Sequence, residues 1–299
     1  MQEQRETGSD AVRPRSGVAG AGAAETALFL LAHQDDEIMV APLISAEKLS
    51  GRAVSIVYLT NGDGGGPTGR RNAESTRYLA SLGVDPRREV LFLGTARGIS
   101  DGTLYRDLAG THDAILEQAR KLPRVVSVYV HAWEGGNPDH DAGHALGLGV
   151  AHALGCADAV RQVPFYRAPS RGPLPFVLYA PLPENGPVAY HRLGFAARLR
   201  RLLAVRHFPS QARTFVRFLP LMLLDAVLNP GIAMQLTAPE RLFERPMRES
   251  LRYERIGYVR FADMAPHVTS YWNSVVSAGQ EHAADAPATA SGEVVWMQG

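Results

Sequence analysis

The chain has 299 residues, of which 45% are hydrophobic and 20% charged, a composition that is typical of a folded globular protein and excludes disorder along the whole length. Its 31 lysines and arginines balance 30 aspartates and glutamates, so the net charge of +1 gives no global indication of a nucleic-acid partner. The single cysteine, Cys156, cannot form an internal disulfide, and the first residues resemble no secretory signal. We therefore expect a cytoplasmic protein without a transmembrane segment.

Along the chain, residues 1–24 are small and polar without apolar periodicity, and we interpret them as a flexible leader. After them, short apolar segments alternate with segments of helical spacing. The predicted strands are 26–32, 53–60, 89–94, 124–131 and 174–180, and the predicted helices are 37–51, 70–82, 111–121 and 138–154. Strands that are apolar throughout have both faces covered. Residues 25–185 are therefore predicted to form an α/β core, a Rossmann-like open, mostly parallel sheet with helices on both faces.

The composition changes after this core. Residues 186–260 contain thirteen arginines and five acidic residues, mixed with apolar residues in helical spacing. We interpret residues 186–280 as an arginine-rich helical C-terminal cap and residues 281–299 as a loose tail. In the simplest interpretation the cap helices bury Phe215, Phe218, Leu219 and Leu221 against the core. The alternatives are a homo-oligomer surface, a basic rim for an anionic sugar conjugate, or a peripheral contact with a membrane.

Two polar segments follow strands that the pattern predicts to be parallel. The first is Ala32–Glu37 (AHQDDE), and the second is Asn137–Asp141 (NPDHD), between His131 and His144. Acidic residues and an Asn-Pro pair are common where helices begin, which explains part of both segments. This explanation does not account for the histidines in the two segments. Because the carboxyl ends of parallel strands open onto one crevice, a His/Asp pair from the first segment and a histidine from the second can hold one ion. Two imidazoles and one carboxylate suit zinc and leave a position open for water.

At these residues the sequence resembles the LmbE-like family of metal-dependent de-N-acetylases, also called the PIG-L family. The family motif AHPDDE is present as AHQDDE, and the family motif HPDH is present as NPDH. The resemblance extends from about residue 28 to residue 180. It implies a Rossmann-like fold, a metal that is usually zinc, and hydrolysis of the acetamide of an N-acetylglucosamine unit.

The resemblance also implies roles for individual residues. His33, Asp36 and His140 correspond to the metal ligands, and Asp35 corresponds to the general base. The chemistry is self-consistent, because zinc lowers the pKa of a bound water to about 7 and a neighbouring carboxylate can take its proton. Iron(II) and cobalt(II) accept the same ligands, so the resemblance leaves Zn²⁺, Fe²⁺ and Co²⁺ open.

Two positions depart from the family pattern. Gln34 replaces a proline and removes no reactive group. Asn137 replaces the histidine that opens the second motif, and an asparagine can donate a hydrogen bond to an oxyanion but cannot deliver a proton at neutral pH. Three outcomes are open: Asp35 moves the proton both ways, another histidine such as His131 or His144 substitutes, or the protein is catalytically weak.

Further residues are candidates for substrate binding. The glycine-rich loop after the second strand resembles a family loop, and this resemblance implies that Asp63 borders the site. It lacks the spacing of a phosphate-binding loop. Arg71 belongs to a family R-x-x-E element that ends at Glu74, and Asp101 resembles a family element that contacts the sugar. His144 is a candidate for substrate binding, for metal ligation or for packing.

The predicted function is zinc-dependent removal of the N-acetyl group from an N-acetylglucosamine-type sugar in a conjugate, with Asp35 as the general base and Asn137 beside it. We keep two alternatives. One is an amidase of the same fold that cleaves a different amide, and the other is a weakly catalytic sugar-binding homologue. A nucleotide-binding role is the least favoured, and no nucleic-acid partner is expected.

Overall fold

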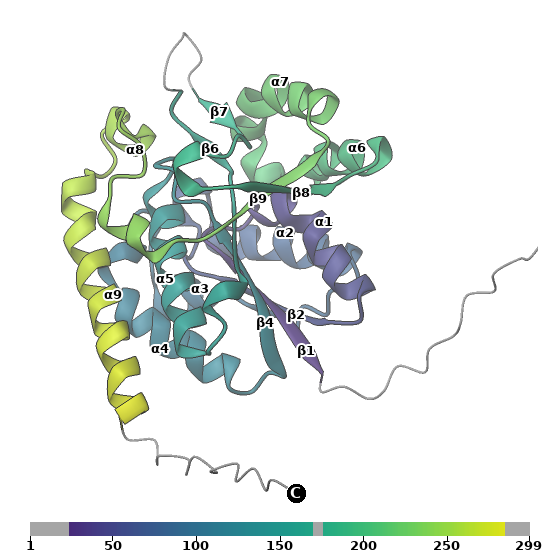
Figure 1. Ribbon diagram of the computed structural model, residues 1–299. Coiled ribbons are helices and arrows are strands. Elements are labelled where there is room, and N and C mark those ends of the chain that lie inside the picture. Colours follow the sequence, from purple (N-terminus) through teal and green to yellow (C-terminus); the bar gives the residue numbers. More distant parts are fainter. Residues whose placement is uncertain (1–23, 170–175, 285–299) are drawn as a thin grey trace, which may run out of the picture.

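The computed structural model describes residues 24–169 and 176–284. Its centre is a seven-stranded sheet with the order β3-β2-β1-β4-β5-β9-β8 (Figure 1). The first five strands in that order are parallel, and β9 and β8 continue the sheet in antiparallel pairing. The predicted Rossmann-like, mostly parallel sheet is therefore confirmed. Its strands are β1 (Glu25–Leu31), β2 (Ala53–Tyr58), β3 (Val90–Leu91), β4 (Arg124–His131), β5 (Val160–Val163), β8 (Val188–Arg192) and β9 (Gly231–Leu236).

Helices cover both faces of this sheet, because its strands are apolar on both sides. In β1, Leu28 and Leu30 pack with the cluster formed by α4, α5 and α9, whereas Phe29 and Leu31 pack with the cluster formed by α1 and α2. A strand buried on both faces is the feature that the uninterrupted apolar run predicts. The five helices of these layers are α1 (Glu37–Leu49), α2 (Thr68–Ser81), α4 (Leu108–Ala119), α5 (Pro138–Ala153) and α9 (Phe261–Ala284).

The other elements in the described part of the chain are further helices, a short strand pair and 3₁₀ turns. They are the helices α3 (Leu93–Arg97), α6 (Phe195–Leu203), α7 (Ala212–Leu228) and α8 (Arg252–Arg255), the short antiparallel pair β6 (Tyr166–Arg167) and β7 (Val177–Leu178), and the 3₁₀ turns η1 (Asp63–Gly65), η2 (Leu104–Arg106), η3 (Ala157–Ala159), η4 (Pro183–Asn185), η5 (Ala204–His207), η6 (Pro209–Gln211) and η7 (Pro239–Phe243). None of the helices in the described ranges is long and apolar enough to cross a membrane.

Two of the predicted strands are shorter than expected. The strand predicted at 89–94 is reduced to β3, because the chain turns into α3 at Leu93. Gly94 permits this turn: a Cβ at that position would lie 2.3 Å from the Cα of Thr60. The strand predicted at 174–180 is reduced to β7, which pairs with β6 outside the main sheet, and residues 170–175 lie outside the described part of the chain.

The segment predicted as an arginine-rich helical cap also contains two strands. Helices α6 and α7 lie where the spacing predicts them, but β8 and β9 in the same segment extend the main sheet. The sequence pattern does not reveal β8, because its residues are mostly exposed and lack apolar alternation. The short strand β5, which carries the pairing from β4 to β9, was also not predicted. The predicted leader, apart from residue 24, lies outside the described residues; the predicted tail begins within α9, and its part beyond residue 284 also lies outside them.

The order of the strands positions the candidate site. Strands β1 and β4 are direct neighbours in parallel register, so the segments that follow them leave the same edge of the sheet. One segment leads from β1 into α1 and contains His33 to Asp36. The other leads from β4 into α5 and contains Asn137 to His140. The two motifs therefore meet in space although about 100 residues separate them.

Candidate metal centre

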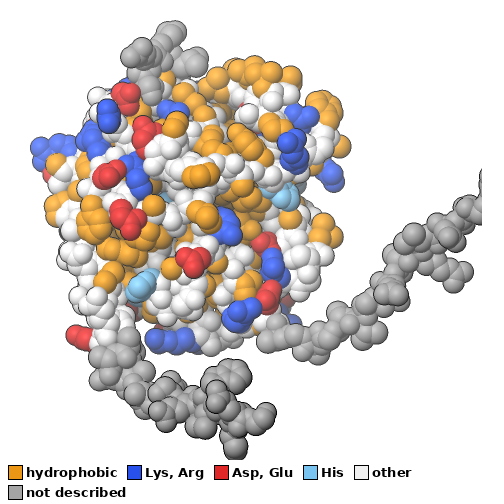
Figure 2. All heavy atoms as spheres, viewed as in Figure 1, with side chains coloured by type: hydrophobic (Ala, Val, Ile, Leu, Met, Phe, Trp, Pro, Cys, Tyr) orange, Lys and Arg blue, Asp and Glu red, His pale blue; other side chains and the backbone are white. Residues whose placement is uncertain are grey.

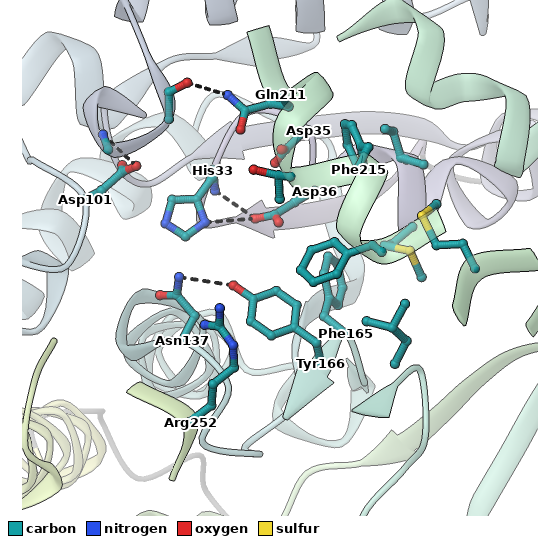
Figure 3. Close-up of a pocket in the computed structure, with 18 of the residues that line it drawn as sticks. His33, Asp35, Asp36, Asp101, Asn137, Phe165, Tyr166, Gln211, Phe215 and Arg252 are labelled. Carbon is teal, nitrogen blue, oxygen red and sulfur yellow. Dashed lines mark hydrogen bonds and ion pairs between the residues drawn. The ribbon is translucent and has the colours of Figure 1, made fainter. Parts of the chain in front are cut away.

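The side chains of His33, Asp36 and His140 converge where β1 and β4 end. One ligand-type atom from each lies within 4.8 Å of the others, and all three residues are buried. His33 Nδ1 lies 3.7 Å from Asp36 Oδ2, and His140 Nε2 lies 3.5 Å from Asp36 Oδ1. Figure 3 shows His33 and Asp36 facing one another at the cavity. The structure thus places together the three residues that the family resemblance implies as metal ligands.

The donor set fits a divalent metal. His140 is 1% exposed, and neither of its ring nitrogens has a hydrogen-bond partner among the residues that the structure describes, which is costly for a buried imidazole without a further ligand. Burial alone would lower the pKa of His33, but the carboxylates of Asp101, Asp139 and Asp36 raise it to about 10. This surplus of negative charge favours a cation at the centre.

A second group of three side chains, His33, Asp101 and Asp139, also lies within ligand distance. Its carboxylates already accept hydrogen bonds from the chain. Asp101 accepts from Thr60 Oγ1 at 2.7 Å and from the amides of Gly62 and Gly64 at 3.0 and 3.1 Å. Asp139 accepts from the amides of Gly102 and Leu104. These carboxylates hold the surrounding backbone, whereas the ring nitrogens of His140 have no hydrogen-bond partner among the described residues, so the set with His140 fits an ion better.

Two further residues hold the candidate ligands in place. His131 Nε2 lies 3.0 Å from Asp36 Oδ2, and its ring stacks on that of His140 with centroids 3.9 Å apart. Burial would raise the pKa of Asp36, but the imidazoles of His131 and His140 hold it well below its usual range, so Asp36 is ionised as a ligand must be. Asp139 contacts His33 on its other ring nitrogen. From sequence alone, Asp139 is explained as an acid of the first helical turn, and its contact with His33 comes from the fold.

Asp35 faces the cavity beside these residues. Its backbone has a φ of 109°, which is rare for a residue with a side chain, and its amide donates to Glu37 Oε2 at 2.8 Å. Its Oδ1 lies 3.4 Å from Arg71 Nη2. Burial raises the pKa of the Asp35 carboxyl to about 8, although Arg71 opposes this rise. The loop conformation therefore presents a carboxylate that can exchange a proton near neutral pH.

Arg71 contacts both Asp35 and the glycine-rich loop. Its Nη1 donates to the carbonyl of Gly62 at 2.7 Å and lies 3.6 Å from Asp101 Oδ2. Gly62 has a φ of 73°, and a Cβ there would collide with the side chain of Gln34. Arg71 and Asp101 both line the cavity, whereas Asp63 is exposed and binds the amide of Asp101 at 3.0 Å. Asp63 therefore supports this loop from outside the cavity.

Asn137 stands at the start of α5, on the cavity wall. Its Oδ1 accepts from the amide of Asp139 at 2.8 Å, which is the N-cap interaction expected for asparagine. Its Nδ2 lies 3.3 Å from the hydroxyl of Tyr166 (Figure 3). The guanidinium of Arg252 lies over the Tyr166 ring, 5.0 Å from its centroid. Tyr166 and Arg252 were not among the predicted site residues, because β6 and α8 carry no local motif.

The other predicted residues lie away from the cavity. His144 is buried behind the site, where Nδ1 lies 2.9 Å from the carbonyl of His131 and its ring faces Trp133. Its contacts match the packing interpretation. Glu74 does not pair with Arg71. Its carboxylate accepts from the amide of Ser210 at 3.1 Å and from Arg70 Nε at 3.1 Å, and so anchors the segment that leads into α7.

The cavity has a volume of about 570 Å³ and two chemically distinct sides. One side is polar and is lined by His33, Asp35, Asp36, Arg71, Asp101 and Asn137, and His140 lies next to Asp36 without lining the cavity. The other side is apolar. It is lined by Ile38, Met39, Phe165, Leu178, Phe215, Phe218 and Met222, of which the last three belong to α7. Such a cavity can receive a ligand with a polar head and an apolar extension.

Comparison with known proteins agrees with this geometry. Residues 28–151 match the model of the PIG-L family, described as GlcNAc-PI de-N-acetylase. No curated protein matches the chain.

Solved structures with a similar fold include three deacetylases. The deacetylase of teicoplanin biosynthesis has a TM-score of 0.54 and 16% identity, over 70% of this chain and 96% of that chain. The A40926 pseudoaglycone deacetylase has a TM-score of 0.53 and 18% identity, over 76% and 99%. The N,N'-diacetylchitobiose deacetylase from Pyrococcus horikoshii has a TM-score of 0.50 and 12% identity, over 76% and 88%. At these identities the similarity shows a common fold. Residues 28–151, which contain both motifs, are therefore similar to the PIG-L family, as the motifs predict.

Proposed function

We propose that this protein is a metal-dependent hydrolase that removes the N-acetyl group from an N-acetylglucosamine-type amino sugar within a larger conjugate. The observation that carries the proposal is the placement of the Asp35 carboxylate in the same cavity as His33 and Asp36, with His140 next to Asp36, in a segment that matches the PIG-L family. The deacetylases of similar fold support the same reaction class.

His33, Asp36 and His140 would hold the metal, with Zn²⁺ the first choice and Fe²⁺ or Co²⁺ compatible with the same ligands. When bound, the ion supplies a water of lowered pKa and polarises the amide carbonyl. The protein contributes the orientation of the ligands. His131 fixes Asp36, and Asp139 fixes His33.

Asp35 is the proposed general base. Its carboxylate takes a proton from the attacking water, and a pKa near 8 also suits it to return that proton to the leaving amine. Arg71 holds the carboxylate in the cavity. Because His131 and His144 do not line the cavity, the geometry favours Asp35 as the group that moves the proton in both directions.

Three residues around Asp35 are proposed to bind the substrate. Arg71 and Asp101 present charge to the sugar hydroxyls from the polar side of the cavity. Asn137 presents an amide N–H that can stabilise the developing oxyanion, as a hydrogen-bond donor rather than an acid. Asp63 and His144 lie outside the cavity, so we assign them supporting roles.

The apolar side of the cavity favours a second candidate function, hydrolysis of a different amide with an apolar substituent. Phe165, Phe215 and Met222 would contact such a group. The two candidate functions differ in the group that the polar side of the cavity binds, a sugar in the first and a different amide substrate in the second. Activity on a panel of amides distinguishes the two functions.

The experiment is to purify the full chain, measure its metal content, remove the metal with a chelator, and restore Zn²⁺, Fe²⁺ or Co²⁺ separately. Acetate release is then measured from N-acetylglucosamine conjugates and from unrelated acetamides. One equivalent of metal and metal-dependent acetate release from the sugar conjugates are expected. Release only from non-sugar amides would favour the amidase, and bound metal without release from any substrate would overturn the proposal in favour of a binding protein.

A further inference from the structure

The outward surface of α6 and α7 is apolar. Figure 2 shows hydrophobic side chains gathered over these helices, with Lys and Arg side chains among them. The large apolar side chains on the outer side of α6 and α7 are each between 37% and 70% exposed in the described structure. We call this surface the outer α6–α7 face. It consists of Phe195, Leu199 and Leu203 of α6 and of Val216, Leu219, Leu223, Leu224, Val227 and Leu228 of α7.

This exposure follows from the helical spacing. In α7, Met222 and Ala226 are buried, whereas Val216, Leu223 and Val227 recur at intervals of seven and four residues on the opposite side. Leu219, predicted from the helical spacing to be buried against the core, is 37% exposed. An ordinary surface helix has a polar outer side. An apolar surface shared by two helices therefore indicates a contact with something outside the described chain.

The segment that forms this face is strongly positive in charge. Residues 195–228 contain six arginines and one acidic residue. That acid, Asp225, is buried and already binds Arg201 and the side chain of Asn229. Arg213 and Arg217, one turn apart at the start of α7, are exposed. The partner of this face must therefore offer both an apolar layer and negative charge.

A second copy of the chain does not meet this requirement. A two-fold dimer through the outer α6–α7 face would place the same arginine-rich surface on both sides, with repulsion between like charges. The interface of an anionic bilayer does meet it. Leucine and valine side chains can enter the boundary between headgroups and acyl chains, while guanidinium groups bind the phosphates.

We propose that the outer α6–α7 face binds peripherally to the surface of a bilayer that contains anionic phospholipids. Phe215, Phe218 and Met222, on the inner side of α7, line the cavity. The helix that contacts the bilayer thus also forms a wall of the candidate site. The proposal does not depend on the reaction that the site performs.

The test is flotation of the full chain with extruded vesicles. One set contains phosphatidylcholine alone, and the other contains phosphatidylcholine mixed with phosphatidylglycerol. We expect binding to the anionic vesicles at about 0.1 M salt and a strong loss at about 1 M salt, where charges are screened beyond about 3 Å. Equal binding to both sets, or no binding to either, would overturn the proposal.

Two double variants identify the surface. Leu223→Ser with Val227→Ser removes apolar area, and Arg213→Glu with Arg217→Glu reverses two charges. Each is expected to weaken partitioning to anionic vesicles by about tenfold or more. All four positions are exposed, so thermal melting should stay near that of the wild type. Wild-type partitioning in these variants would show that another part of the chain binds lipid and would overturn the assignment.

Matched controls come from other surfaces. Phe243→Ser changes a residue that is 53% exposed on η7, which contacts α9 rather than α6 or α7. Arg88→Glu changes an exposed arginine that pairs with nearby Asp85. Both controls should partition like the wild type. Light scattering without lipid measures whether the wild type is a dimer. If it is a dimer, if Leu223→Ser with Val227→Ser makes it a monomer, and if no vesicle binds, then this face is a protein interface and the membrane proposal is overturned.

Discussion

His33 Nε2 lies 3.1 Å from Asp139 Oδ2, although the two residues are 106 positions apart in the chain. The carboxylate of Asp139 is itself fixed, because it accepts hydrogen bonds from the backbone amides of Gly102 and Leu104. With Nε2 held in this way, the Nδ1 atom of His33 is left facing Asp36. A carboxylate behind a metal-binding histidine sets the tautomer and the orientation of the ring.

Replacing Asp139 should therefore weaken metal binding without removing a ligand. We expect Asp139→Asn to lower metal affinity by roughly 10- to 100-fold, because the amide is a poorer acceptor for the His33 N–H. Competition with a chromophoric chelator measures the change. Asp113→Asn, at an exposed position of α4, is the control and should keep wild-type affinity. An unchanged affinity in Asp139→Asn would show that His33 does not need this partner.

Replacing Asp35 should separate chemistry from metal binding. We expect Asp35→Asn to lower kcat by roughly 10²- to 10⁴-fold, the usual contribution of a general base, while the metal content stays at the wild-type level. Asparagine has the shape of aspartate and tolerates a positive φ better than alanine does, so the loop at φ 109° should be kept. Full turnover in this variant would exclude Asp35 as the base.

The fold could be predicted from the sequence where burial on both faces creates uninterrupted apolar segments. That condition holds for β1, β2 and β4, whose lengths agree closely with the predicted ones. It fails for β8, an edge strand with mostly exposed side chains. Strand β9 is largely buried, but it is stabilised by antiparallel pairing with β5 and β8, and no local pattern specifies such partners.

The centre of the site was likewise predictable, because its residues lie at the carboxyl ends of two neighbouring parallel strands. The family resemblance then singles out His33, Asp36 and His140, which the structure brings together. Tyr166 and Arg252 reach the same cavity from β6 and α8, and only tertiary packing places them there. His144 was a candidate because it follows the second motif, but the structure buries it with its ring against that of Trp133.

Asn137 has two separable functions, capping α5 and presenting an amide to the cavity. We expect Asn137→Ala to lower the free energy of unfolding by about 1 kcal/mol, because the amide of Asp139 loses its acceptor. Asn137→Ser keeps an oxygen for the cap and should stay near wild-type stability. Denaturant unfolding measures this difference.

The same pair of Asn137 variants tests the proposed contact with the oxyanion. Both remove the Nδ2 donor, so both should lower kcat, by about 10²-fold or more if the donor acts in the transition state. A serine variant with full kcat would restrict Asn137 to its structural function. Asn137→Asp is the control for the cap, since it keeps the acceptor and lacks the N–H donor.

His144 should make the stability of the metal-free protein depend on pH. Burial lowers the pKa of His144 from 6.5 to about 4, and its Nδ1 lies 2.9 Å from the carbonyl of His131. Between these two values the unfolded chain binds a proton that the folded chain does not. The free energy of unfolding therefore falls as the pH falls from about 6.5 to about 4, by roughly 3 kcal/mol at most.

The variant His144→Gln isolates this contribution, because glutamine can still donate to the carbonyl of His131 but does not titrate. Other buried groups shift stability with pH as well, among them His140 and Glu134, so the relevant quantity is the difference between the two proteins. Urea unfolding at several pH values, with chelator present, should show a steeper loss of stability on acidification in the wild type than in the variant. The difference in slope should approach about 1.4 kcal/mol per pH unit, the value for one proton. Equal slopes would mean that His144 is protonated in the folded protein, and its placement as a neutral donor to the carbonyl of His131 would then be wrong.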